Sequence, residues 1–577
     1  MTIAPVLNPD PVRGREARTP RGRRVALVVA VVTTLAAVVQ QVLHAVGVVG
    51  GQPWPWLLVA APAWLLVRRG PRATPAPPPL VVRATGRLRR IPAWAGAVAV
   101  LAMATAVWAA LQDHEPLIGH EEAVYGNKAR SWLDGTPDAG WGTYRPVGLP
   151  ALGRIALAVH DDVGALRVVA LLLTLFTLAT TYLIAARLTT PRRAVVATLL
   201  LLSGLGFLRR LPLFLNDIGA TGLLLIVVYL LVRAQEKPGS RALMLLPFPA
   251  LAAFYLRYGV VGTLAAIAVA AVLAYGPRAW LAQGRRLALG AGVLLAGLIP
   301  HFGYATEATG SPLGLVFSAT EHAGRAYVGD GLVYYLAVFP YRLAGDLGGV
   351  VMAVGLWGLG AAVQRRRRGD RFTGAARAQR RDRGRVFLGM TAVLTFIVLG
   401  VATDGEPRFV YLPVVLLTVL GVQTLAESAG RWSTTVLTAV AALAAVTVPA
   451  TAQYVAHDAM PGPTAQRLST LAVARQLAGD RPCLLVTGYE PDLGWYSGCD
   501  AVTYGQYRRM APATSGAAGG SGASGIEVSL VLFERGRLQP GPASLRRLIG
   551  GRATTTRTIP TEGSLGTATV ITLRARN

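Results

Sequence analysis

The chain is poor in charged residues for its length. Only 15% of its 577 residues are Asp, Glu, Lys or Arg, whereas a soluble protein carries about 25%. Hydrophobic residues make up 53% and the mean hydropathy is +0.46. This composition excludes a soluble enzyme and a disordered protein. With only two cysteines, the chain is also not a small protein built on a framework of disulfides.

Several motifs of well-known chemistry are missing. The seven histidines are scattered, and no Cys/His cluster has the spacing of a zinc site. The sequence contains no P-loop and no GxGxxG after a strand. We therefore expect no metal ligands of the zinc type and no nucleotide cofactor, while dependence on a divalent metal stays open.

The sequence instead contains long unbroken apolar runs. A membrane barrel would show alternating segments of about ten residues, so these runs indicate transmembrane helices. The sequence predicts about 13 spans of about 17–25 residues each, with several of them short. The predicted spans lie at 24–50, 53–67, 92–111, 164–186, 194–209, 216–233, 242–257, 259–276, 286–304, 346–364, 386–402, 409–428 and 433–454.

The net charge of +28 could suggest a nucleic-acid partner, but the placement of the arginines indicates otherwise. They cluster in 13–24, 68–90 and 365–385, next to apolar runs, as in cytoplasmic loops. Binding of these segments to anionic lipid or RNA remains a minor alternative. With the N-terminus inside, every short basic segment falls on the inner side, and the acidic loop 112–163 falls outside. We therefore expect a multi-pass plasma-membrane protein with a cytoplasmic N-terminus and no nucleic-acid partner.

The fold class predicted is an all-α polytopic membrane protein with a small C-terminal extracytoplasmic α/β domain. Its expected parts are a basic tail (1–23), two extra N-terminal helices (24–67), a Pro/Arg-rich linker (68–91), a membrane core (92–454) and the outside domain (455–577). In that domain, 467–478 has the pattern of an amphipathic helix. CLLVTG, IEVSLVLF and TATVITL have the pattern of strands.

Cys483 and Cys499 both lie in the predicted outside domain. An even pair of cysteines in an oxidising compartment predicts one disulfide. The alternative is two unpaired thiols.

The first large outside loop contains the most informative stretch of the sequence. Glu121 and Glu122 are adjacent there, and Tyr125 and Arg130 follow at helical spacing. A carboxylate at a helix start just outside the bilayer can serve as general base for a hydroxyl acceptor. The same pair could instead cap the helix, where negative charge is favourable.

Acidic and basic side chains from further outside loops are expected at the same membrane face. Asp217 opens the span 216–233 and is either functional or a helix cap. Arg257 and Tyr258 end another span, and Glu406 and Arg408 begin the span 409–428. Arginine suits a phosphate group, because the guanidinium fork matches its oxygens. Carboxylates suit an acceptor hydroxyl.

The stretch HEEAVYGNKARSWLDG, followed by YRPVGLP, resembles the first-loop signature of polyprenol-phosphate-sugar-dependent membrane glycosyltransferases of the C-type fold. That family includes the aminoarabinose transferases and the protein O-mannosyltransferases. The resemblance covers roughly 92–454 and an outside C-terminal domain like the family's, and leaves the helices at 24–67 outside the pattern.

The resemblance implies roles for single residues. The catalytic base would be Glu121, where the family more often has Asp, and the basic residue before proline that binds the donor phosphate would be Arg145. The acid of the second loop would be Asp217, and the closing motif would be Glu406, Pro407, Arg408 and Phe409.

The sequence therefore predicts an inverting glycosyltransferase that moves a sugar from a polyprenyl phosphate to a hydroxyl acceptor. Glu121 would be the base, with Glu122 and Asp217 as further catalytic acids. Tyr125, Tyr258 and Glu406 are predicted to bind substrate together with the arginines Arg145, Arg257 and Arg408. The expected partners are the lipid-linked sugar, membrane lipid and a glycan or protein acceptor. The alternative function is a lipid or solute transporter, although transporters tend to show paired repeats and polar residues deep in their spans.

Overall fold

The structure is a computed structural model of the chain, and it describes residues 20–45, 56, 59–60, 63–64, 91–114, 117–321, 326–368, 375–457, 461–479, 482–516, 526–536 and 539–574. The chain divides into two units, Met1–Pro78 and Pro79–Asn577. The predicted tail 1–23 lies largely outside the described residues, as do most of the second expected helix at 53–67 and nearly all of the linker 68–91.

The first unit contains the helix α1 (Pro20–Ala45). The apolar part of α1, Val25–Gln40, is shorter than a full span. The hydroxyl of Thr33 donates to the carbonyl oxygen of Val29 at 2.6 Å, within the helix. Trp64 Nε1 donates to the Thr34 hydroxyl at 3.1 Å, so the side chain of Trp64 lies against α1.

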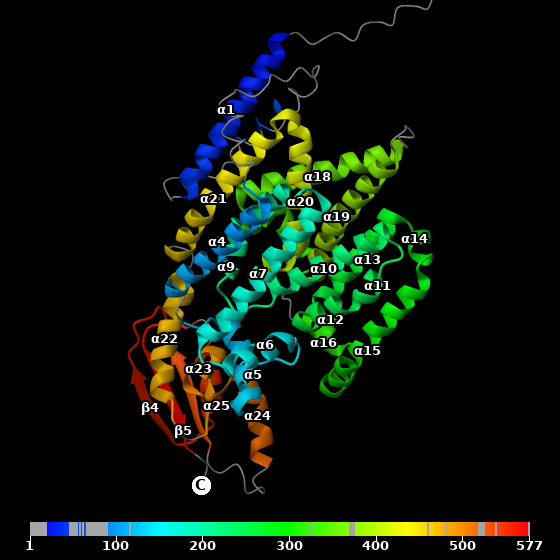
Figure 1. Ribbon diagram of the computed structural model, residues 1–577. Coiled ribbons are helices and arrows are strands. Elements are labelled where there is room, and N and C mark those ends of the chain that lie inside the picture. Colours follow the sequence, from blue (N-terminus) through cyan, green and yellow to red (C-terminus); the bar gives the residue numbers. More distant parts are fainter. Residues whose placement is uncertain are drawn as a thin grey trace, which may run out of the picture. The chain divides into compact units, whose positions relative to one another are not determined.

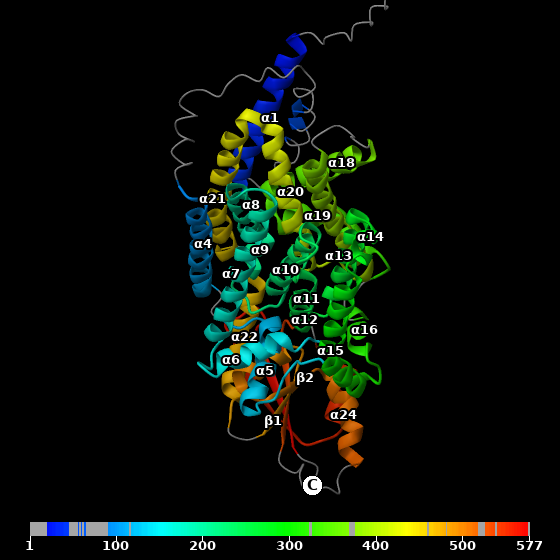
Figure 2. The ribbon, with the colours of Figure 1, turned by 45° about the vertical axis from the view of Figure 1, so that its right-hand side comes forward.

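The second unit begins with a helical bundle (Figures 1 and 2). Its helices are α4 (Ala93–His114), α5 (His120–Asp134), α6 (Gly148–Leu157), α7 (Val163–Leu188), α8 (Pro191–Leu202), α9 (Leu205–Arg210), α10 (Asp217–Glu236), α11 (Ala242–Leu245), α12 (Pro247–Leu256), α13 (Val260–Tyr275), α14 (Pro277–Leu281), α15 (Gly284–Thr309), α16 (Gly314–Glu321), α17 (Asp330–Leu343), α18 (Gly345–Arg368), α19 (Ala375–Ala402), α20 (Tyr411–Ala429) and α21 (Ser433–His457). Short 3₁₀ turns, η1 (Pro407–Val410) and η2 (Gly430–Trp432), precede α20 and α21.

Among the described residues, seven segments are long and apolar enough to cross a membrane. They are Ala93–Gln112, Val163–Leu188, Asp217–Glu236, Gly284–Thr309, Gly345–Arg367, Arg381–Ala402 and Pro407–Ala456. The last segment contains both α20 and α21. The polytopic membrane fold is thus confirmed, whereas the expected count of about 13 is not.

Other expected spans form shorter or divided helices. The run 194–209 is divided between α8 and α9 at Gly204, where a Cβ atom would lie 2.3 Å from the carbonyl oxygen of Leu343. The run 242–257 is divided between α11 and α12, and Pro247 at the start of α12 has no N–H to continue the preceding helix. The run 259–276 forms α13, which is 16 residues long.

Glycines allow α18 and α20 to pack closely. A Cβ atom on Gly355 would lie 2.3 Å from the carbonyl oxygen of Leu417, and one on Gly421 would lie 1.9 Å from that of Val351. Small residues at such contacts let two backbones approach each other inside a membrane. The other close helix pairs are α13 with α19 and α7 with α10.

The C-terminal region is a small α/β domain. Its helices are α22 (Pro461–Leu477), α23 (Glu490–Ser497), α24 (Tyr504–Gly516) and α25 (Pro542–Ile549). Its strands are β1 (Cys483–Val486), β2 (Asp500–Val502), β3 (Glu527–Phe533), β4 (Thr554–Ile559) and β5 (Ala568–Leu573). The expected helix at 467–478 and three expected strands correspond to α22, β1, β3 and β5, whereas β2 and β4 were not predicted.

The five strands form one mixed sheet in the order β2-β1-β3-β5-β4. β1 runs parallel to β2 and β3, whereas β5 runs antiparallel to β3 and β4. Alternate residues of β3 point to opposite faces. Phe533 joins a core with α22 and α23, and Leu530 joins a second core with α25. The sheet is therefore covered by helices on both faces.

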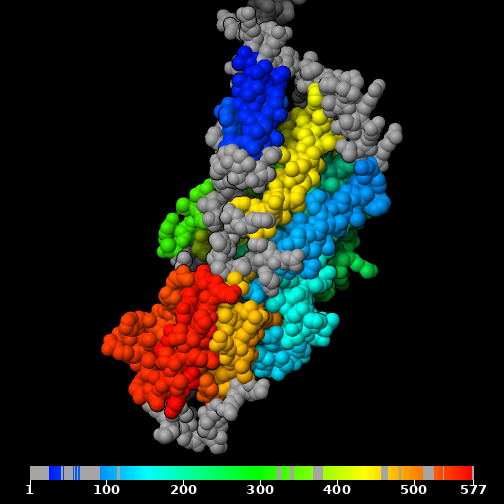
Figure 3. All heavy atoms as spheres, turned by 90° about the vertical axis from the view of Figure 1, so that its left-hand side faces the viewer, coloured from blue at the N-terminus to red at the C-terminus, as the bar shows by residue number. Residues whose placement is uncertain are grey.

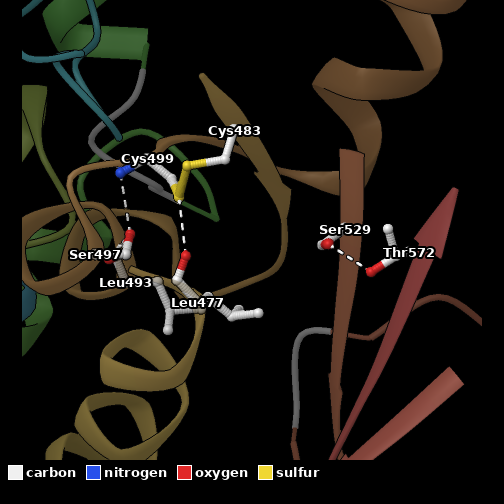
Figure 4. Close-up of a disulfide and its surroundings, with 7 residues drawn as sticks. All are labelled: Leu477, Cys483, Leu493, Ser497, Cys499, Ser529 and Thr572. Atoms are coloured by element: carbon white, nitrogen blue, oxygen red, sulfur yellow. Dashed lines mark hydrogen bonds between the residues drawn. A yellow bond between two sulfur atoms is a disulfide. The ribbon is translucent and has the colours of Figure 1, made fainter. Parts of the chain in front are cut away.

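A disulfide joins Cys483, at the start of β1, to Cys499, just before β2 (Figure 4). The N–H of Cys499 donates to the hydroxyl of Ser497 at 3.1 Å. The Sγ atom of Cys499 lies 3.8 Å from the carbonyl oxygen of Leu477, at the end of α22. The bond thus ties the sheet to the turn that follows α23.

The C-terminal domain packs on α5, and Figure 3 shows the amber atoms at the start of this domain beside the cyan atoms that follow α4. Arg130 lies 3.6 Å above the ring of Trp495 and donates to the carbonyl oxygen of that residue at 3.0 Å. The amide of Asn127 donates to the carbonyl oxygen of Pro491 at 3.0 Å. A Cβ atom on Gly126 would lie 2.9 Å from the Trp495 ring, so the small residue is what lets the two surfaces meet.

Candidate active site

Five chain segments bring charged side chains together at the end of the bundle that carries the C-terminal domain. Glu121 lies in the first turn of α5, and Arg145 lies just before α6. Asp217 opens α10, Arg257 caps the C-terminus of α12, and Arg408 lies in η1. The structure therefore places five of the predicted site residues in contact with one another, although they are far apart in sequence.

Glu121 is the carboxylate that remains open to solvent in this cluster. Arg145 Nη1 lies 2.8 Å from its Oε2, and Arg408 Nη2 lies 4.0 Å from its Oε1. Its side chain is 35% exposed. Burial raises the pKa of the Glu121 carboxyl, but the attraction of Arg145 and Arg408 outweighs this and holds the pKa below its ordinary value. The carboxylate is therefore ionised, as a base must be.

Asp217 forms a second ion pair beside the first. Its Oδ1 accepts from Arg257 Nη1 at 2.5 Å, and its side chain is only 4% exposed. Its Oδ2 has no hydrogen-bond partner among the described residues. Asn216 occupies the N-cap position of α10 and makes no capping hydrogen bond with its side chain. Asp217 thus acts as the partner of an arginine, and its second oxygen is left for a further donor.

η1 connects the two ion pairs. Arg257 Nη1 donates to the carbonyl oxygen of Arg408 at 3.3 Å, and its guanidinium lies 4.3 Å from the ring centre of Phe409. Arg408 interacts electrostatically with both Asp217 and Glu121. The three arginines Arg145, Arg257 and Arg408 therefore form one basic surface around the two carboxylates.

Glu406 and Tyr258 are held differently from the other predicted substrate-binding residues. Glu406 pairs with Arg408 two residues later, and its carbonyl oxygen accepts from the Tyr335 hydroxyl at 3.2 Å. Tyr258 is buried against the rings of Phe254 and His301. Glu406 thus orients an arginine of the site, whereas Tyr258 contributes to an aromatic cluster beneath it.

Tyr125 is buried under the guanidinium of Arg145, whose carbon lies 5.6 Å from its ring centre. The Tyr125 hydroxyl accepts from the amide of Asn216 at 3.3 Å, and the same amide donates to the carbonyl oxygen of Leu256 at 2.6 Å. Burial raises the pKa of Tyr125, so its phenol stays protonated. Asn216, which was not predicted as a site residue, thus links α5, α10 and α12.

Glu122 is only 2% exposed. Its two oxygens accept from Arg167 Nε at 3.2 Å and Nη2 at 3.0 Å, from Phe214 N at 2.8 Å and from Gly119 N at 3.0 Å. All its acceptor positions are used within the protein. The helix-capping alternative therefore describes the contacts of Glu122, and its expected catalytic role stays a prediction.

Arg167, the partner of Glu122, was also not predicted. It is among the largest fully buried side chains and lies in α7. It donates to the carbonyl oxygen of Leu117 at 2.8 Å as well. An arginine within an apolar span is unusual enough that its position in LRVVALLLT is the signal that could have identified it.

Two cavities open beside the cluster. A narrow cleft of about 10 Å³ lies between α10, α13 and η1, with Asp217, Arg257 and Phe409 in its wall. A larger cavity of about 250 Å³ lies between the start of α5 and the C-terminal domain. We call it the α5–α22 pocket, and its polar wall is formed by His120, Glu121, Arg210, Gln466, Arg467 and Asp492. Glu121 faces this pocket, whereas Asp217 faces the cleft.

Within the described part of the chain, no three His, Cys, Asp or Glu side chains lie close enough together to hold a metal ion.

Comparisons with known proteins agree with this architecture. Residues 145–304 match the family model of the dolichyl-phosphate-mannose-protein mannosyltransferases. No curated protein matches the chain.

Two solved structures share the fold. ArnT from Cupriavidus metallidurans in the apo state is similar with a TM-score of 0.59 and 14% identity, over 85% of this chain and 98% of that one. The same protein bound to undecaprenyl phosphate gives a TM-score of 0.58 and 15% identity, over 82% and 97%.

The resemblance to membrane glycosyltransferases of the C-type fold is thus confirmed. At this identity the matches to solved structures show the fold, and together with the match to the family model they support membrane glycosyltransferases as the class. The donor, the acceptor and the residues that act on them are matters for proposal.

Proposed function

We propose that the chain is an inverting glycosyltransferase that uses a polyprenyl-phosphate-linked sugar at the outer face of the plasma membrane. The observation that carries the proposal is the position of Glu121. Its ionised carboxylate opens onto the α5–α22 pocket on one side and contacts two arginines on the other. A base between a hydroxyl site and a phosphate site is what transfer from a lipid phosphate requires.

The reaction follows from this placement. Glu121 accepts the proton of the acceptor hydroxyl, and the oxygen attacks the anomeric carbon of the donor sugar. The bond from that carbon to the phosphate oxygen breaks, and the polyprenyl phosphate leaves with the electron pair. Arg145 and Arg408 stabilise the charge that develops on this leaving group. Asp217 holds Arg257 beside Arg408, and its free oxygen faces the cleft.

Donor binding also activates the base. The phosphate of the donor would bind Arg145 and Arg408, the arginines that neutralise Glu121 in the free protein. The attraction that lowers the pKa of Glu121 in the free protein is then shared with the phosphate. The carboxylate becomes a stronger base only after the donor has bound, which disfavours proton transfer in its absence.

Contacts at the other end of the bundle support the proposed orientation. Arg187 pairs with Glu236, Arg365 pairs with Asp382, and Arg385 pairs with Glu427. The segments predicted to be cytoplasmic therefore meet one another, away from α5 and the sheet (Figure 2). The positive-inside rule assigns this end to the cytoplasm and the site to the outer face.

The test of the function is the fate of the donor. Membranes that contain the protein are supplied with a panel of polyprenyl-phosphate sugars, each radiolabelled in the sugar. The proposal predicts that at least one donor releases free polyprenyl phosphate and passes its label to another molecule. Transporter function, the second candidate, predicts movement of intact donor across the membrane without cleavage, and that result would overturn the proposal.

A further inference from the structure

The α5–α22 pocket has a composition that indicates what occupies it. We propose that it is the acceptor site and that it binds the terminal sugar unit of a neutral saccharide, through residues that the C-terminal domain supplies. This inference rests on the proposed function, because it identifies the acceptor of the same reaction.

The wall of the pocket carries charges of both signs. Arg210 and Arg467 line it together with the carboxylates of Glu121, Glu122 and Asp492. Glu121 is paired with Arg145, and Glu122 is paired with Arg167. A strongly anionic ligand would meet the carboxylates and a strongly cationic one would meet the arginines, so the pocket favours a neutral ligand.

The pocket also holds a hydrogen-bond acceptor that lacks a donor. Asp492 is only 6% exposed, and its Oδ1 has no hydrogen-bond partner among the described residues. Its Oδ2 lies 3.7 Å from His120 Nδ1. Buried acceptors are rarely left unpaired, and a ligand hydroxyl can donate to this oxygen. The amide of Gln466 can both donate and accept, which suits the hydroxyls of a sugar.

The size of the pocket limits the ligand further. Its volume of about 250 Å³ is near the lower end of pockets that hold small ligands, about 300 Å³. One sugar unit fits such a cavity, whereas a stretch of polypeptide needs a longer groove. Because Glu121 forms part of the wall, a hydroxyl of the bound sugar lies beside the proposed base.

Five of the twelve residues that line the pocket belong to the C-terminal domain. Gln466 and Arg467 lie in α22, and Asp492 lies in α23. Arg467 Nη1 donates to the carbonyl oxygen of Leu117, just before α5, at 3.3 Å. The domain therefore completes the acceptor site, and its residues would decide which saccharide is accepted.

The native cysteines make a direct binding test possible. Both are joined in the disulfide, so Gln466→Cys introduces the single free thiol of the full-length protein. The rate at which a maleimide alkylates position 466 is measured in lipid nanodiscs. The probes are a panel of neutral disaccharides of hexoses and pentoses, with a decapeptide of Ser and Thr for comparison.

We expect at least one disaccharide to slow alkylation saturably by fivefold or more, and the peptide to have no effect. Adding Asp492→Asn should raise the half-protecting concentration about tenfold, since a hydrogen bond to a charged group is lost. Two matched controls should show no change. The disaccharide should not slow alkylation of the Arg475→Cys protein, whose thiol lies at an exposed position on α22. Adding Asp500→Asn in β2 to the Gln466→Cys protein should leave the half-protecting concentration unchanged.

Protection by the peptide alone, no protection by any disaccharide, or an unchanged half-protecting concentration in Asp492→Asn would each overturn the inference. The assay contains no donor, so it is independent of turnover. Release of polyprenyl phosphate without any protection of position 466 would support the proposed function and contradict this acceptor site. Protection of position 466 without donor cleavage would contradict the proposed function alone.

Discussion

Glu121 and Glu122 are neighbours in the chain with opposite surroundings. Glu121 is 35% exposed and shares its charge with two arginines that a ligand can reach. Glu122 is 2% exposed and accepts four hydrogen bonds from the protein itself. One residue is thus free to exchange a proton, and the other is committed to the fold.

The ion pairs of Glu121 predict an unusual pH dependence. Its pKa in the free protein lies below the ordinary value, about 4.3. The acid limb of kcat/KM, which reports the free enzyme, should therefore lie below about pH 4.3. The acid limb of kcat should lie at higher pH, because bound donor phosphate competes for the arginines. Initial rates from pH 4 to 8 test this, and a kcat/KM limb near pH 6 would contradict it.

The same shift affects stability. Because the folded-state pKa is depressed, the ion pair stabilises the fold above the unfolded-state pKa. This contribution is lost as the pH falls through the folded-state value.

Arg145→Ala should both raise the KM for the lipid donor and lower kcat, because charge on the leaving phosphate grows in the transition state. Loss of one such contact costs about 100-fold in kcat. Arg145→Lys should recover part of the activity, since lysine offers a point charge without the fork. Steady-state kinetics with purified protein measure these changes.

The control for Arg145 is Arg367→Ala, an exposed position at the other end of the bundle. It should leave both constants unchanged in correctly inserted protein. Equal effects of the two substitutions would mean that the active face has been assigned to the wrong end.

At the scale of elements, α5 is held in place by buried polar contacts. Glu122 links its first turn to Arg167 in α7 and to the backbone before α10. These contacts of Glu122 fix the first turn of α5. Because Glu121 lies in the same turn, they also hold Glu121 in its position between Arg145 and Arg408.

Breaking these contacts should destabilise the protein strongly. Glu122→Gln or Arg167→Met leaves an unpaired buried charge, which costs about 3 kcal/mol or more. The double variant should be less destabilised than the sum of the two singles, since no unpaired charge remains. Thermal unfolding of the four proteins in detergent measures this coupling. Additive losses would show that the pair does not act as a unit.

The sequence predicted some elements better than others for physical reasons. Charged side chains near the ends of apolar runs indicated Glu121, Asp217, Arg257 and Arg408, whereas Arg145 was indicated by the resemblance to the family's first-loop motif. The pairing among them could not be predicted, because it depends on how α5, α10, α12 and η1 meet in space. The different surroundings of the two adjacent acids could not be predicted either, because they depend on Arg167, which lies within an apolar span.

Secondary structure also could not be predicted where it depends on contacts between elements. Long apolar runs such as 164–186 correspond to single helices, whereas α8 and α9 are divided where Gly204 meets the backbone of Leu343. β4 escaped detection because its residues are polar and almost all exposed. It lies at the edge of the sheet, where it has one neighbouring strand and pattern-based signals are weakest.

At the scale of the whole molecule, the C-terminal domain is part of the site and not an appendage. It covers α5 through Trp495 and Pro491 and supplies five of the twelve residues that line the α5–α22 pocket. Stability of this domain should therefore affect activity.

The disulfide is the feature of the domain that can be measured most simply. We expect Cys483 and Cys499 to be bonded in protein isolated from membranes without reductant. They are separated by 16 positions, and closing a loop of that size is worth about 3 kcal/mol on the chain-entropy model. Mass spectrometry of the non-reduced protein should find no free thiol. Two alkylated cysteines would contradict the expectation.

The account as a whole depends on Glu121 as the base. The most direct measurement is release of polyprenyl phosphate by purified Glu121→Gln protein, with the donor that the wild type uses. The substitution keeps the shape of the side chain and removes the basic oxygen. We predict that turnover is abolished while the protein stays folded, with an unfolding temperature that is lowered by the loss of the ion pair with Arg145. Normal turnover by folded Glu121→Gln protein would contradict the central claim.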